Sequence, residues 1–167
     1  RYTERTEHLV RLALATAALV EDDDDTPVPV LNAISELAQA TGLAPLGVPT
    51  LTQSPRVFER AVVAALGDAA GHASVAYNLA ALDRSAGALR DRLSPAHGSL
   101  VRGMGEDFHA RMAWCESEEA PATGFAGGEL QAALEHLANQ LAAVTGAQSD
   151  RMTRDDGWRL LTIGRLA

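Results

Sequence analysis

One pair of residues has the spacing of metal ligands on a helix. Glu106 and His109 are three positions apart, which is the pattern that presents two ligands to the metals of di-iron helical bundles. Such a centre also needs a second Glu-x-x-His pair and two further carboxylates. The sequence has no second copy, and Glu4 and His8, for example, are four positions apart. A solvated helix face is therefore the favoured interpretation of Glu106 and His109, and a metal-binding helical bundle is a minor alternative.

Two clusters of arginines and carboxylates could bind an anion. In the first, Arg1 and Arg5 are four positions apart, so in a helix their like charges repel. In the second, Arg90 and Ser94 lie one turn apart near the end of an expected helix. The planar guanidinium group pairs bidentately with carboxylates and with bound anions. The alternative, which stays open, is a set of interhelical salt bridges that only orient the helices.

The catalytic alternative uses carboxylates, because no local motif marks a nucleophile. A Ser-His-Asp triad also stays open, because its members need only meet in space. There is no G-x-S-x-G phrase, and the single cysteine, Cys115, has no Cys/His signature around it. In this alternative Glu4, Asp91 or Asp156 acts as a general acid or base, and arginines stabilise an anionic transition state. It predicts a concave pocket that holds a strongly perturbed carboxylate.

The charge composition excludes several classes of protein. All 14 basic residues are arginine and the net charge is -8, so nucleic-acid binding is disfavoured. Without lysine the chain cannot carry a P-loop lysine or a Schiff-base lysine. One cysteine cannot form an intramolecular disulfide, which favours a cytoplasmic location, and the longest apolar stretch, 12–20, is too short to cross a membrane. We expect no cofactor.

The sequence predicts an all-α protein. Alanine and leucine dominate and aromatic residues make up only 4%, which favours helices over strands. Mostly short connections favour an antiparallel helical bundle of about six to seven helices within a single domain, 1–167. A period of 3.6 residues, interrupted by proline and glycine, gives helices at about 2–20, 30–41, 55–67, 71–94, 95–115, 129–146 and from 153 onward.

Three phrases resemble the alpha-E domain family, a group of bacterial helical domains named for a Glu-Arg motif. RYTERTE, at 1–7, resembles the family phrase G-R-Y-x-E-R-A-E. SVAYNLAALDRSAGALRDRLS, at 74–94, is similar to its long central helix, which ends in R-D-x-[IL]-S. MTRDDGWRLLTIGRLA, at 152–167, resembles D-x-G-W-x-F-L-x-[IL]-G-R. The chain departs from the pattern at 83–87, where the family has R-E-N-A-R, and at His97, where the family has tryptophan.

The resemblance implies a context for the chain. Family members are nearly twice this length, so we expect the chain to be a piece of a longer alpha-E region, roughly its first half. We also expect 1–7 and 158–165 to lie on helices that pack near each other. Alpha-E domains accompany circularly permuted ATP-grasp proteins, and their implied role is in ATP-dependent amide or peptide-bond formation.

The leading hypothesis is therefore a non-catalytic accessory or binding domain of a peptide-ligase system. Its expected partners are the ATP-grasp ligase, other domains of the same polypeptide, or an acidic peptide product, and the chain could also form a homo-oligomer. The residues that we expect to bind are Arg1, Tyr2, Glu4, Arg5, Arg90, Asp91, Ser94, Trp158 and Arg165.

Overall fold

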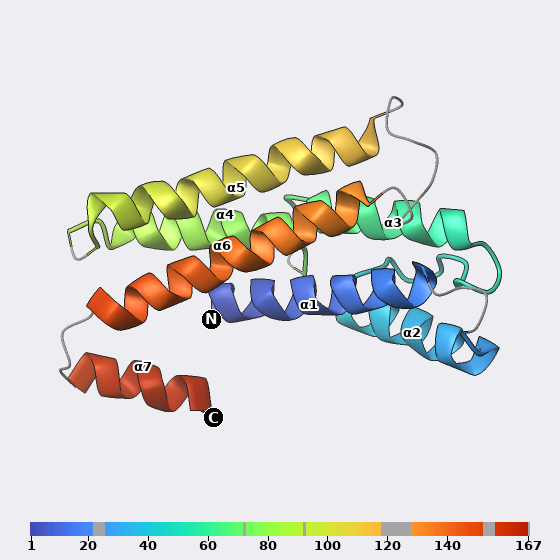
Figure 1. Cartoon of the computed structure of the whole chain (residues 1–167), viewed down its shortest axis with the longest axis horizontal. Coiled ribbons are helices and arrows are strands. Elements are labelled where there is room, and N and C mark those ends of the chain that lie inside the picture. The colour runs from blue at the N-terminus through green and yellow to red at the C-terminus, as the bar shows by residue number, and fades with distance from the viewer. Residues whose placement is uncertain (22–25, 72, 92, 118–127, 152–155, 167) are drawn as a thin grey trace.

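Seven α-helices make up the part of the fold that the structure describes. The computed structural model describes residues 1–21, 26–71, 73–91, 93–117, 128–151 and 156–166, and within these ranges it contains no strand. The prediction of an all-α protein is confirmed. The helices, shown in Figure 1, are α1 (Tyr2–Glu21), α2 (Val28–Thr41), α3 (Pro55–Gly67), α4 (Val75–Ala88), α5 (Pro95–Glu116), α6 (Glu129–Arg151) and α7 (Asp156–Leu166).

Four of these helices form an antiparallel bundle. α1 packs against α4 and α6, and α5 packs against the same two helices from the other side. Successive members run in opposite directions, so the starts of α1 and α5 and the ends of α4 and α6 point toward the same end of the bundle, although α1 begins farther inward than the other three termini (Figure 1). α3 lies in line with α4 and packs on α4 and α5, whereas α2 packs on α1. The connection topology therefore decides which helix termini become neighbours.

α7 lies at the same end of the molecule as the start of α1 (Figure 1). We expected 1–7 to pack near 158–165, which would bring α1 and α7 together. Among the described residues, α7 does not pack closely against α1 or against any other helix. The first and last phrases thus share an end of the molecule without forming a closely packed helix pair.

Leucines at helical spacing supply much of the core. On α6 the buried apolar residues are spaced by three or four positions, as a helix with one core-facing stripe requires. The other core helices contribute large side chains that are buried almost completely, among them Phe58 on α3 and Phe108 on α5. The burial of this stripe, more than helix propensity, stabilises the bundle. The buried α6 residues of the stripe are Leu130, Leu134, Leu137, Leu141 and Val144.

Serine side chains set the starts of α4 and α5. Ser74 Oγ accepts a hydrogen bond of 2.9 Å from the backbone N–H of Tyr77, and Ser94 Oγ accepts one of 3.2 Å from that of His97. Each bond satisfies one of the N–H groups that the first turn of a helix leaves without a partner. The capping position of Ser74 explains why α4 begins at Val75.

Two helix boundaries differ from the sequence prediction. We expected the segment 71–94 to be the longest helix, but α4 has 14 residues and α6 has 23. α4 ends after Ala88, where the N–H of Leu89 donates to the carbonyl of Ala86 and closes a turn. Gly87 lowers helix stability at this point. α2 begins earlier than expected, since Pro29 is tolerated in its first turn, where the N–H has no helical partner.

Each helix in the described ranges is too short or too polar to span a lipid bilayer.

Candidate functional site at the arginine end of the bundle

The first cluster lies at the start of α1. The amino group of Arg1 is 3.4 Å from the Glu4 carboxylate, and the two side chains are 78% and 54% exposed. The Arg5 side chain is also exposed, and its guanidinium has no ion-pair partner among the described residues. Tyr2 is half-buried and packs against the hydrophobic core. The cluster therefore presents two arginines to solvent on a helix start that Tyr2 anchors.

The second cluster lies in the connection between α4 and α5. Arg90 Nε is 4.0 Å from Asp91 Oδ1, and these side chains are 85% and 95% exposed. An ion pair this long and this exposed contributes little to stability. Ser94 has a different role, because its hydroxyl caps α5. The structure thus separates Arg90 and Asp91, which face solvent, from Ser94, whose hydroxyl accepts the bond from the first turn of α5.

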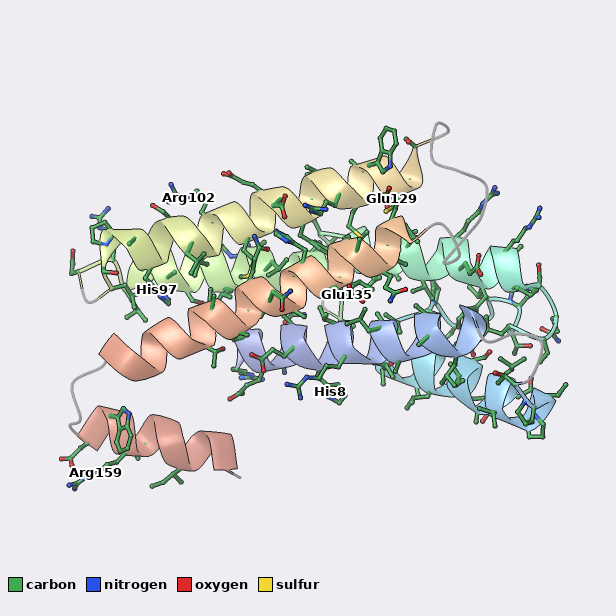
Figure 2. The ribbon with its side chains drawn as sticks, in the orientation of Figure 1. His8, His97, Arg102, Glu129, Glu135 and Arg159 are labelled. Atoms are coloured by element: carbon green, nitrogen blue, oxygen red, sulfur yellow. The ribbon has the colours of Figure 1, made fainter. Side chains whose placement is uncertain are left out.

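The third group of predicted residues lies on α7. Trp158 is half-buried, and Arg159 Nη1 lies 3.5 Å from Asp156 Oδ1, one turn earlier. Figure 2 shows Arg159 on the outside of the molecule, at the start of α7. The side chain of Arg165 lies outside the described residues.

The start of α1, the connection between α4 and α5, and the start of α7 lie toward the same end of the molecule (Figure 1). We use the name arginine end for the four exposed arginines that these segments carry, Arg1, Arg5, Arg90 and Arg159. Two N-termini and two C-termini of the bundle helices point toward this end, so their opposite dipoles largely offset each other. The side chains therefore set the local charge. Guanidinium groups with only long, local ion pairs are available to bind carboxylates of another molecule.

Interhelical salt bridges, the alternative explanation of the arginine clusters, occur elsewhere. Arg102 Nε on α5 is 3.9 Å from Asp83 Oδ1 on α4, and the carboxylate of Asp107 pairs with His136 across α5 and α6. Figure 2 shows Arg102 on the outer side of α5. Neither of these interhelical pairs includes an arginine of the arginine end. Orientation of the helices therefore does not explain the clusters.

The catalytic candidates are all exposed. The side chains of Glu4, Asp91 and Asp156 are 54%, 95% and 93% exposed, and each lies next to an arginine on the surface. None of the three lines the concave hollow between the ends of α2 and α3. The arrangement does not supply the buried acid or base that the catalytic alternative needs.

Glu106 and His109 occupy an exposed face of α5. Within the ranges that the structure describes, no group of three or more histidine, cysteine, aspartate or glutamate side chains is placed to hold a metal ion. Structural metal sites need about four protein ligands. Glu106 and His109 have the spacing of two such ligands, but the described residues do not supply the other ligands.

The structure adds contacts that the sequence analysis missed. Oδ2 of Asp107 lies 3.1 Å from Nε of Arg111 and 3.1 Å from Nε2 of His136. The i,i+4 spacing of Asp107 and Arg111 is a signal that could have revealed the first contact. The contact with His136 depends on the packing of α5 against α6. His97 is buried in the first turn of α5, and Figure 2 shows it beneath that helix.

Cys115 lies near the end of α5 and is half-buried. Burial raises the pKa of its thiol above the usual range, and the negative charges of Glu129 and Glu116 raise it further. A raised pKa keeps the thiol protonated, and therefore a poor nucleophile, at neutral pH. Cys115 thus behaves as a packing residue.

The fold and the site together define a class: an antiparallel helical bundle with an exposed arginine end. A family model, Alpha-E, described as a predicted alpha-helical domain with a conserved ER motif, matches residues 1–167. The chain belongs to the Alpha-E family. Neither a curated protein nor a solved structure matches it. The chain has two Glu-Arg dipeptides, Glu4-Arg5 on α1 and Glu59-Arg60 on α3, and only the first lies at the arginine end.

Proposed function

We propose that this chain is a non-catalytic binding domain whose arginine end contacts an acidic group of another molecule. The observation that supports the proposal is that three separate segments, which lie toward the same end of the molecule, carry the exposed residues Arg1, Arg5, Arg90 and Arg159. Their side chains are exposed, and the guanidinium ion pairs of Arg90 and Arg159 measure 4.0 Å and 3.5 Å. A bidentate carboxylate ligand can replace such weak pairs.

The proposed biological setting is an ATP-grasp-type peptide or amide ligase system. Membership of the Alpha-E family supports it, together with the family's implied link to ATP-grasp proteins. In this setting the arginine end binds the ligase, another domain of the same polypeptide, or the acidic peptide product, in the cytoplasm. The exposure of the three candidate carboxylates favours binding over catalysis.

A charge-reversal experiment tests the proposal. We expect the chain to bind a hexaglutamate peptide and to copurify with an ATP-grasp ligase at low salt. The double substitution Arg5→Glu and Arg90→Glu should weaken peptide binding at least about tenfold, because two guanidinium contacts are lost. Isothermal titration calorimetry at two salt concentrations measures the effect, which salt should reduce.

The matched control reverses two exposed arginines on α3, with Arg56→Glu and Arg60→Glu. It changes the net charge by the same amount but leaves the arginine end intact. Equal loss of binding in both double variants would show that only the overall charge matters, and the proposal would then fail. Circular dichroism confirms that both variants keep their helices.

A further inference from the structure

An open hollow of about 590 Å³ lies between the last turns of α2 and α3 and the segment that leads into α4. It is found near the junction of α3 and α4, away from the arginine end (Figure 1). It belongs to no site considered so far. Its lining residues are small or apolar for the most part, and they include no arginine or histidine.

The walls of the hollow are suited to an aliphatic group. Ala40, Ala64 and Ala73 line it together with Leu46, which is 84% exposed. Gly42 caps α2 with φ 78°, and a Cβ added there would lie 2.7 Å from Cβ of Ala73. The end of α2 therefore fits closely against the segment before α4, and this close fit fixes the shape of the hollow.

The electrostatics of the hollow favour a cation. α2 and α3 both end there, and neither has a basic residue in its last turn, so the negative ends of both dipoles lack a compensating charge. Asp68, the C-cap of α3, adds a carboxylate at a place where negative charge is unfavourable. Among the described residues it has no ion-pair partner. Three negative features thus converge on one apolar hollow.

The carboxylate geometry selects the kind of cation. Oδ1 of Asp68 accepts a hydrogen bond of 2.9 Å from the N–H of Ala70. Oδ2 lies close to Gly71, another lining residue, at the place where a Cβ would stand, and has no hydrogen-bond donor among the described residues. A guanidinium group binds best to two free carboxylate oxygens, whereas an ammonium group is a compact charge that can use one oxygen and nearby helix carbonyls. A metal ion is disfavoured, because within the described ranges no group of three metal-ligating side chains occurs.

We infer that this hollow binds a primary alkylammonium group, with the ammonium beside Asp68 and the aliphatic chain against the alanine walls. Residues 1–167 contain no lysine, so the group comes from outside these residues. It can belong to a free aliphatic amine or to a lysine side chain. The inference does not depend on the function proposed for the arginine end.

The test is a titration of the full chain with n-butylammonium chloride, followed by NMR shifts of the alanine methyl groups. We expect saturable, weak binding and no saturation with n-butanol, the uncharged analogue. The substitution Asp68→Asn should weaken binding about threefold to fivefold, which is the size expected for an exposed ion pair. Asparagine keeps an oxygen that can accept the N–H of Ala70, so the local turn is preserved.

Two further variants complete the experiment. Glu36→Gln on α2 removes one negative charge outside the hollow and should leave binding unchanged. Ala64→Leu fills the hollow without a change of charge and should weaken binding. Equal responses to n-butylammonium and n-butanol would overturn the inference, as would equal effects of Asp68→Asn and Glu36→Gln. Binding of Nα-acetyl-lysine amide more tightly than n-butylammonium would identify a lysine side chain as the source, and the reverse order a free amine.

Discussion

The carboxylate of Asp107 on α5 lies 3.1 Å from Nε2 of His136 on α6, and the same oxygen accepts a hydrogen bond from Arg111. This group joins two helices that pack closely in the bundle. All three side chains are more than a third exposed, so water screens their charges. The contact therefore helps to orient α5 relative to α6, whereas burial of the hydrophobic core holds the two helices together.

The substitution Asp107→Ala should lower the free energy of unfolding by about 0.5 to 1 kcal/mol, because a partly exposed ion pair with Arg111 and a polar contact with His136 are lost. Urea denaturation measures the change. Asp91→Ala is the matched control, since its carboxylate is 95% exposed and lies 4.0 Å from its partner. It should leave stability unchanged, and an equal loss in both variants would remove the role assigned to Asp107.

Alanine substitutions at Gly42 and Gly47 distinguish the cost of a left-handed backbone from the cost of steric overlap. Both have positive φ, 78° and 84°, but an added Cβ would meet Ala73 only at Gly42. Gly47→Ala should cost about 1 kcal/mol from the left-handed backbone alone. Gly42→Ala should cost clearly more, because it adds the overlap with Ala73. Thermal unfolding of the two variants measures the difference, and equal costs would contradict the close fit at the end of α2.

Ser94 is expected to stabilise α5 and not to bind a ligand. Ser94→Ala should lower the free energy of unfolding by about 1 kcal/mol, the usual cost of losing a helix cap. Peptide binding at the arginine end should stay unchanged. Ser99→Ala, an exposed change within the same helix, should be neutral for stability. Loss of peptide binding in a stably folded Ser94→Ala variant would show that Ser94 contributes to binding, and would contradict a role limited to capping.

Cys115 should react slowly with iodoacetamide near pH 8, because burial and two carboxylates raise its pKa and keep the thiolate scarce. Glu129→Gln should lower this pKa and speed the reaction, whereas Glu135→Gln, farther along α6, should not. The folded protein holds the thiol proton more tightly than the unfolded chain. The free energy of unfolding should therefore fall as the pH rises past the pKa of the unfolded thiol. A reaction rate equal to that of a small thiol would disprove the raised pKa.

The helices could be predicted from the sequence because their signals are local. The leucine stripe of α6 and the proline at the start of α3 act on residues within a turn or two, so spacing alone revealed them. The prediction of a helix over 71–94 was wrong at both ends. The long apolar pattern favoured one continuous helix, whereas Ser74 caps the start of α4 and Gly87 weakens its end. The helix ends in this segment depend on turns that periodicity does not describe.

The sequence by itself determined the seven helical segments, their apolar stripes and the local Arg-Glu and Arg-Asp pairs. These features arise between residues that are three or four positions apart. Only the tertiary structure decided that the segments carrying Arg1, Arg90 and Arg159 lie toward one end, that Asp107 contacts His136, and that the ends of α2 and α3 line a hollow. The physical reason is that these relationships depend on the direction in which each helix packs against its neighbours. Burial of the whole core sets that direction, and no local spacing encodes it.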